Sequence, residues 1–177
     1  MLELKNISKT FNAGTVNQKV ALNGLNLTMN EGDFVTVIGG NGAGKSTMLN
    51  AIAGVFQVDT GKILIDGVDY RERSQLWLHS SIGYVLQSPH LFSGTVMENI
   101  RYGRLEASEQ EVRRAAEAVS ADTVVNKLEQ GYDSPVGEGG DRLSTGEKQL
   151  ISFARAVLAD PRIFVLDEAT SSVDTRT

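Results

Sequence analysis

The feature that most constrains this chain is a glycine-rich loop between an apolar run and a helical pattern. Residues Gly39–Thr47 match G-x-x-x-x-G-K-[ST] at every fixed position. The run before the loop, Phe34–Ile38, is short, apolar and rich in β-branched residues, which is typical of a buried parallel strand. After the loop, Met48, Leu49 and Ile52 recur at helical spacing. The sequence therefore predicts a strand, a tight loop and a helix, the context in which this pattern binds phosphate.

Each residue type in the loop has a chemical use. Glycines let successive backbone amides turn inward around phosphate groups, and the following helix adds its free amides and the positive end of its dipole. We predict that Lys45 reaches the β- and γ-phosphates of ATP and that the Ser46 hydroxyl ligates Mg²⁺. A glycine-rich turn without a ligand is the alternative, and the strand–loop–helix context disfavours it. The residues expected to surround the phosphates are Gly39, Asn41, Gly42, Ala43, Gly44, Lys45, Ser46 and Thr47.

Composition removes several classes of function. A net charge of −5 argues against a nucleic-acid partner, which would require a basic face. The absence of cysteine leaves no disulfide framework and no thiolate metal site. No apolar run approaches the ~18 residues of a membrane helix, and the N-terminus lacks the features of a signal peptide. We therefore expect a soluble, cytoplasmic chain that serves a membrane process only through a partner.

Strand-like and helix-like segments alternate along the chain. Three capping boxes, S/T-x-x-E, mark helix starts at Thr95, Ser108 and Ser144. This order predicts an α/β fold with a mostly parallel sheet, a small antiparallel β subdomain at the N-terminus and an inserted helical subdomain. Besides the strand before the loop, the expected strands are Leu2–Ile7, Val20–Met29, Lys62–Asp66, Ile82–Leu86 and Ile163–Leu166.

An acidic pair follows the last of these strands. Asp167 and Glu168 would lie at the C-terminal edge of a parallel sheet, where ligands gather. Beside a phosphate-binding loop, Asp167 is expected to hold the Mg²⁺ shell and Glu168 to polarise an attacking water. A helix-capping acidic pair is the alternative, which the loop upstream disfavours.

Together these segments resemble the nucleotide-binding domain of an ABC transporter, a P-loop NTPase. Five motifs occur in that family's order over essentially the whole chain. They are Phe11 at the adenine-stacking position, the Walker A loop, Gln87 in a Q-loop, Leu143–Glu147 at the signature, and Ile163–Asp174 as Walker B and D-loop. The resemblance implies a single domain over 1–177, divided into a β subdomain and P-loop core (1–86), a helical subdomain with the signature (87–160), and Walker B with the D-loop (161–177).

The resemblance also implies partners and roles. Glu168, Lys45 and Gln87 would be catalytic, and Ser46, Gln87 and Asp167 would hold Mg²⁺. Ser144 and Gly146 would contact the γ-phosphate of a second nucleotide-binding domain in a head-to-tail dimer. Hydrolysis of ATP would then power transport through a transmembrane partner at the inner face of the membrane.

Three departures from the family pattern matter. The signature has Thr145 for glycine and Glu147 for glutamine, and the added negative charge is expected to weaken the closed dimer. The family continues to a switch histidine, whereas the histidines here are His79 and His90, so the resemblance implies a C-terminally truncated domain. An importer-like P-loop half and an exporter-like second half also suggest a chimera joined between about 59 and 81.

Four functions remain to be weighed. An ATP-hydrolysing transport motor is favoured, and a nucleotide-binding fragment with little or no turnover is the alternative. The negative net charge of the chain and the exporter-like segment 137–140 argue against a non-transport ATPase of the same family. A small-molecule kinase is set aside, because it would not explain the segment from Gln87 to Asp174.

Overall fold

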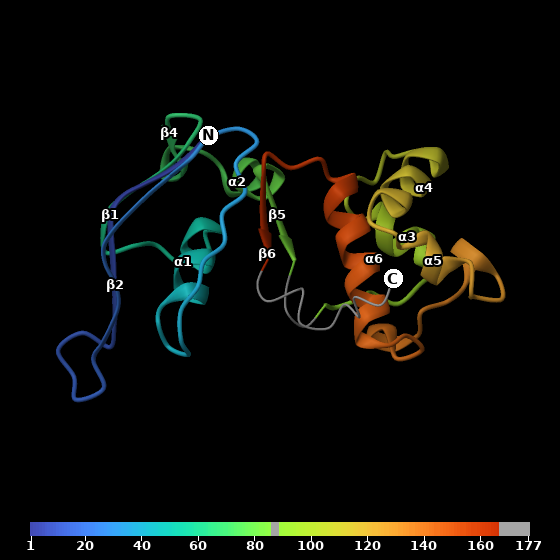
Figure 1. Cartoon of the computed structure of the whole chain (residues 1–177), viewed down its shortest axis with the longest axis horizontal. Helices are drawn as coiled ribbons and strands as arrows, with labels where there is room; N and C mark the ends of the chain where they lie inside the picture. The colour runs from blue at the N-terminus through green and yellow to red at the C-terminus, as the bar shows by residue number, and fades with distance from the viewer. Residues whose placement is uncertain (86–88, 167–177) are drawn as a thin grey trace. The chain divides into compact units, whose positions relative to one another are not determined.

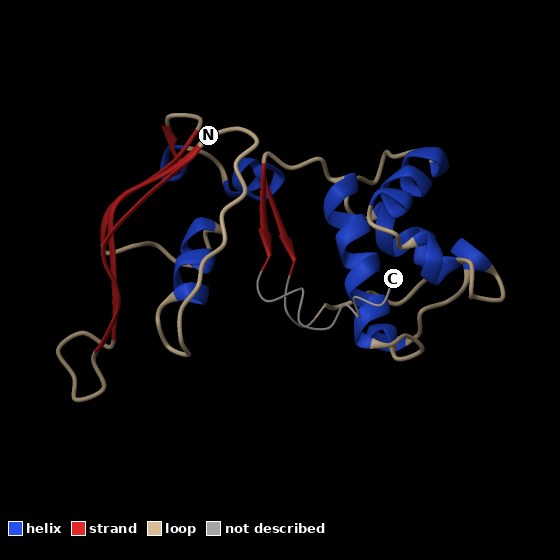
Figure 2. Cartoon of the chain, viewed as in Figure 1, coloured by secondary structure: helices blue, strands red, loops and turns tan. Residues whose placement is uncertain are grey.

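The computed structural model describes residues 1–85 and 89–166 (Figure 1). The chain divides into two compact units, Met1–His79 and Ser80–Thr177. Each unit has its own sheet and its own helices (Figure 2). The two units are therefore described separately.

The first unit contains an antiparallel sheet of four strands in the order β2-β1-β3-β4. Alternate side chains of β1 and β3 point into the core, where Leu2, Leu4, Ile7, Ile63 and Ile65 are buried. This confirms the expected antiparallel β subdomain at the N-terminus. The strands are β1 (Leu2–Phe11), β2 (Lys19–Met29), β3 (Thr60–Ile65) and β4 (Val68–Asp69).

The two hairpins of this sheet differ in how tightly they turn. Between β3 and β4, Asp66 and Gly67 have φ of 50° and 78°, and Ile65 pairs with Val68, which makes a two-residue turn of the primed type. The β1–β2 hairpin is long, and its register runs from Leu2 opposite Met29 to Phe11 opposite Lys19. The register of this hairpin sets which side chains of β1 and β2 share a face.

The segment Phe34–Ile38 is not the buried strand that its sequence predicts. It has no regular secondary structure, and the side chains of Phe34 and Ile38 are 87% and 90% exposed. Within the first unit the four strands pair only with one another. The backbone of 34–38 therefore lacks a neighbouring strand to complete a ladder, and apolar, β-branched composition alone does not make a strand.

Three short helices complete this part of the chain. Helix α1 (Lys45–Ile52) begins directly after the glycine-rich loop and buries Met48, Ala51 and Ile52. Gly54 has φ of 73° just after the helix, the left-handed conformation that commonly ends one. The 3₁₀ helix η1 (Tyr70–Glu72) follows β4, and α2 (Gln75–Ser81) follows η1 across the boundary between the units.

The second unit combines a parallel strand pair with a helical bundle. Strands β5 (Ile82–Val85) and β6 (Ile163–Leu166) pair in parallel, from Ile82 opposite Ile163 to Val85 opposite Leu166. Both strands were expected, and their parallel pairing confirms the α/β class. The helices are α3 (Val96–Arg101), α4 (Glu109–Ala118), α5 (Asp122–Val125), η2 (Gly131–Asp133), η3 (Glu138–Gly140) and α6 (Thr145–Leu158).

The long helix α6 is the centre of the bundle. It packs against α3 and α4, and the apolar core between them includes Leu91, Ile100, Val112, Ile151 and Leu158. All three predicted capping boxes are present. In each, the N-cap hydroxyl accepts a hydrogen bond from the N3 backbone amide, and the N3 glutamate carboxylate accepts one from the N-cap backbone amide. These local signals fix where α3, α4 and α6 begin.

Candidate functional site

The glycine-rich loop meets helix α1 at a position that only glycine can occupy. Gly44, the N-cap of α1, has φ of 89°, a left-handed conformation that L side chains rarely adopt. A Cβ at Gly44 would also lie 2.4 Å from the carbonyl oxygen of Ala21 in β2. The loop is therefore held against the β1–β2 hairpin at its end, and its remaining residues 39–43 are exposed.

The N-terminus of α1 is open to an anion. Among the residues that the structure describes no side chain caps it, and its first turn contains no acidic residue. The capping boxes of α3, α4 and α6 by contrast fill the same kind of site with a glutamate. Uncapped amides and an unopposed helix dipole are the physical requirements for binding phosphate at a helix start.

Lys45 lies where its ammonium group can meet that anion. Its Nζ donates hydrogen bonds to the carbonyl oxygens of Gly39 and Gly40. The side chain therefore folds back over the loop rather than extending into solvent. A phosphate group seated in the loop would offer charged oxygens in place of these two carbonyls.

Part of the predicted Mg²⁺ site can be examined. Ser46 lies in the first turn of α1 and is exposed, so its hydroxyl is open to solvent beside the loop. Gln87, Asp167 and Glu168 lie outside the described residues. A hydroxyl, an amide oxygen and a carboxylate are the hard oxygen donors that suit Mg²⁺, so the predicted set fits the ion by its chemistry. Among the described residues no group of three or more acidic or histidine side chains could hold a metal on its own.

Phe11, the expected adenine platform, lies in an aromatic cluster at the end of β1. Its ring meets Phe56 edge to face with centroids 5.6 Å apart, and Lys9 Nζ lies 5.7 Å from the Phe11 centroid. Lys9 in turn donates to Asp59 Oδ1 at 2.8 Å, and this bond lowers the pKa of the Asp59 carboxyl. The cluster therefore gives Phe11 a supported position on the same hairpin that contacts Gly44.

The signature residues form the start of helix α6. The Ser144 hydroxyl donates to Glu147 Oε2 at 2.8 Å and accepts from the Glu147 amide at 3.3 Å, and the Ser144 amide donates to the same carboxylate at 2.8 Å. The Glu147 carboxylate therefore occupies the Ser144 hydroxyl, one of the donors that the family resemblance assigns to a partner's γ-phosphate. Both readings of the motif, helix cap and anion site, apply to the same atoms.

A buried polar contact joins the segment after Gln87 to α6. Asn99 is fully buried, and its Oδ1 accepts from Arg155 Nη2 at 3.0 Å while its backbone oxygen accepts from Arg155 Nε at 2.8 Å. The third guanidinium nitrogen donates to the His90 carbonyl at 3.1 Å. Burial lowers the pKa of Arg155, which still remains charged at neutral pH.

This contact was not predicted from the sequence. Asn99 follows the glutamate of a capping box, and Arg155 lies 56 residues further along the chain. No local signal connects two residues at that separation. Only the packing of α3 against α6 brings them together.

Comparison with known proteins agrees with this arrangement. The family model described as "ABC transporter" matches residues 22–171. The chain belongs to the ABC transporter family. It is 44% identical over 176 residues to an uncharacterized ABC transporter ATP-binding protein, YfiC of Bacillus subtilis, covering 99% of this chain and 28% of that protein. It is 49% identical over 153 residues to a fatty acid ABC transporter ATP-binding/permease protein of Mycobacterium bovis, covering 86% of this chain and 24% of that one.

A solved structure matches both units of this ABC chain. The structure of a bacterial Atm1-family ABC exporter with ATP bound superposes with a TM-score of 0.91 and 37% identity over 99% of this chain and 30% of the exporter chain. One exporter therefore matches both halves, which gives no support to a chimera of two subfamilies. The chain spans less than a third of the length of these relatives.

Proposed function

We propose that this chain is an ATP-binding cassette that binds Mg-ATP on Gly39–Thr47 and, as a head-to-tail pair, hydrolyses it to power membrane transport. The observation that carries the proposal is the open N-terminus of α1. It follows a loop of exposed residues, has neither a side-chain cap nor an acidic residue, and has Lys45 folded over it. An anionic phosphate chain offers hydrogen-bond acceptors to the uncapped amides and a negative charge to the Lys45 ammonium group.

The proposed roles follow from residue chemistry. The amides of the loop and of the first turn of α1 hold the phosphates, and Lys45 neutralises charge at their distal end. Phe11 supports the adenine ring. Bound Mg²⁺ would neutralise charge on the phosphate oxygens, and Ser46, Gln87 and Asp167 are the residues proposed to hold it. Glu168 accepts a proton from the attacking water, and Gln87 reports on the occupied site.

A second copy is proposed to complete the site. In this chain the loop residues 39–43 are exposed, so the phosphates would stay in contact with water on one side. Ser144 and Gly146 of a second cassette would cover them, adding a hydroxyl and a helix N-terminus. In this chain the Glu147 carboxylate already accepts from the Ser144 amide and hydroxyl. When the dimer closes on the phosphates, the Ser144–Glu147 hydrogen bonds must therefore be broken or shared with a phosphate oxygen. This competition weakens the dimer.

This competition gives a test of the proposal. In a Glu168→Gln background that slows turnover, we expect Glu147→Gln to tighten Mg-ATP-dependent dimerisation about tenfold, because removing one charge near a phosphate is worth roughly 1–2 kcal/mol. Glutamine still completes a capping box, so α6 keeps its start. Ser144→Ala should weaken the dimer. Sedimentation velocity with and without Mg-ATP measures both changes.

The chain offers a matched control for this experiment. Ser108 and Glu111 form the same box at the start of α4, with amide and hydroxyl bonds to Glu111 Oε2 of 2.8 and 2.7 Å. Glu111→Gln should leave dimerisation unchanged. Equal effects of Glu147→Gln and Glu111→Gln, or no nucleotide-dependent dimer in any variant, would count against the paired site.

The membrane partner is proposed from the relatives. Within the part of the chain that the structure describes, every helix is too short or too polar to cross a membrane. Relatives of three to four times this length carry ATP-binding and permease functions in their names. We therefore propose that the cassette works at the cytoplasmic face, coupled to a transmembrane domain. One observation supports the alternative, a binding module with little turnover: the carboxylate of Glu147 at the signature.

A further inference from the structure

One lysine connects the adenine platform with the phosphate loop. Lys19 begins β2 and is the cross-strand partner of Phe11 in the β1–β2 hairpin. Directly opposed residues of an antiparallel pair place their side chains on the same face, with Cβ atoms about 4.5–5.5 Å apart. Lys19 and Phe11 therefore project from one face of the hairpin.

The ammonium group of Lys19 lies beside the loop. A Cβ at Gly42 would lie 3.6 Å from Lys19 Nζ, so the charge is close to the middle of the phosphate-binding sequence. Gly42 has φ of 80° and is exposed. Lys19 therefore spans the distance between the residue proposed for adenine and the loop proposed for phosphate.

Lys19 also differs from two other lysines of the sheet in its ion pairing. On the same sheet Lys9 pairs with Asp59 and Lys5 pairs with Glu3. Lys19 has no carboxylate partner among residues 1–85 and 89–166, and it is exposed. Its ammonium group can therefore meet an anion at this edge of the loop without breaking an ion pair.

We infer that Lys19 is a second cation of the nucleotide site and contacts the phosphate nearest the ribose. This inference rests on the proposed function, because it needs a nucleotide with adenine at Phe11 and phosphates on the loop. Lys45 acts at the distal end of the phosphate chain and Lys19 at its proximal end. Lys19 therefore contributes to the affinity for any adenine nucleotide that keeps its first phosphate, and not to the affinity for adenosine.

The test compares nucleotides that differ in their phosphates. We expect Lys19→Gln to lower affinity for Mg-ATP, ADP and AMP by similar factors of about three to tenfold, typical of a partly solvated charge pair. Affinity for adenosine, measured by competition, should not change. The ATP affinity of the variant should also depend less on salt concentration than that of the wild type.

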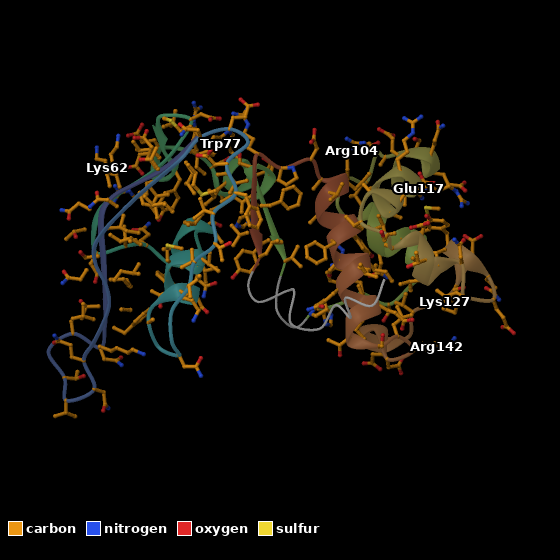
Figure 3. All side chains as sticks on the ribbon, in the orientation of Figure 1. Lys62, Trp77, Arg104, Glu117, Lys127 and Arg142 are labelled. Atoms are coloured by element: carbon orange, nitrogen blue, oxygen red, sulfur yellow. The ribbon has the colours of Figure 1, made fainter. Side chains whose placement is uncertain are left out.

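Lys62→Gln is the matched control. Lys62 is an exposed lysine of β3 in the same sheet, and Figure 3 shows it projecting from that sheet. A Lys19→Gln variant that behaves like Lys62→Gln, or one that loses adenosine as strongly as ATP, would overturn the inference. If wild type binds no Mg-ATP, or if Lys45→Ala binds it as well as wild type, the proposed function fails first and this inference fails with it. If Lys45→Ala loses ATP while Lys19→Gln does not, only the inference fails.

Discussion

Replacing Lys45 with alanine is expected to weaken Mg-ATP binding by roughly 100-fold or more, which corresponds to about 3 kcal/mol of lost charge-assisted hydrogen bonding. The lysine follows Gly44, whose left-handed backbone directs the chain into α1, and its ammonium group is held over the loop carbonyls. Without it, the negative charge on the distal phosphates has no cation from the loop itself. Isothermal titration with Mg-ATP measures the loss.

The fold should survive this change. Within the described residues Lys45 bonds only to carbonyl oxygens of its own loop, whose residues 39–43 are exposed, so its removal leaves no buried group there unpaired. The midpoint of thermal unfolding should stay within a few degrees of wild type, and Lys62→Ala should bind ATP normally. Micromolar binding retained by a folded Lys45→Ala variant would disprove the assignment of the loop.

The largest expected effect on stability is at Asn99. We expect Asn99→Leu to lower the free energy of unfolding of the second unit by about 3–5 kcal/mol, the range for breaking a buried, charged hydrogen-bond network. The side chain also accepts from the Phe92 amide at 2.9 Å and donates to the Phe92 and Thr95 carbonyls at 2.8 and 3.0 Å. Leucine has a similar volume but makes none of these bonds, and it leaves Arg155 underpaired.

Hydrogen exchange of the α6 amides measures this loss in the second unit alone. Asn126→Leu is the control, because Asn126 is exposed at the end of α5 and should change stability by no more than about 0.5 kcal/mol. Equal exchange rates in α6 for both variants would mean that the Asn99–Arg155 contact does not hold the bundle together. The contact joins α3 and the segment after Gln87 to the last turn of α6, so its loss should disturb the C-terminal end of that helix first.

The features that local chemistry determines were predicted from the sequence. The three capping boxes are satisfied within four residues of each helix start. The glycine pattern of the loop likewise places φ of 80° at Gly42 and 89° at Gly44. Each of these features depends on residues that are adjacent in sequence, so a short sequence motif can predict it.

Features that depend on distant segments could not be predicted in this way. Whether Phe34–Ile38 forms a strand depends on a partner strand, and composition does not supply one. The proximity of Lys19 to Gly42 depends on the register of a hairpin with a seven-residue loop and on how α1 packs against β2. The bond between Asn99 and Arg155 depends on the packing of two helices. The roles of Gln87, Asp167 and Glu168 remain predictions, because these residues lie outside the described parts of the chain.

We propose that this cassette hydrolyses ATP with Glu168 as the base, and steady-state phosphate release measures that role. We predict that wild type releases phosphate from Mg-ATP and that Glu168→Gln lowers the rate at least about 100-fold, within the range for loss of a general base. ATP affinity should not change, and Glu129→Gln, at an exposed glutamate between α5 and η2, should match wild type. Equal rates of phosphate release from wild type and Glu168→Gln would show that Glu168 is not the base.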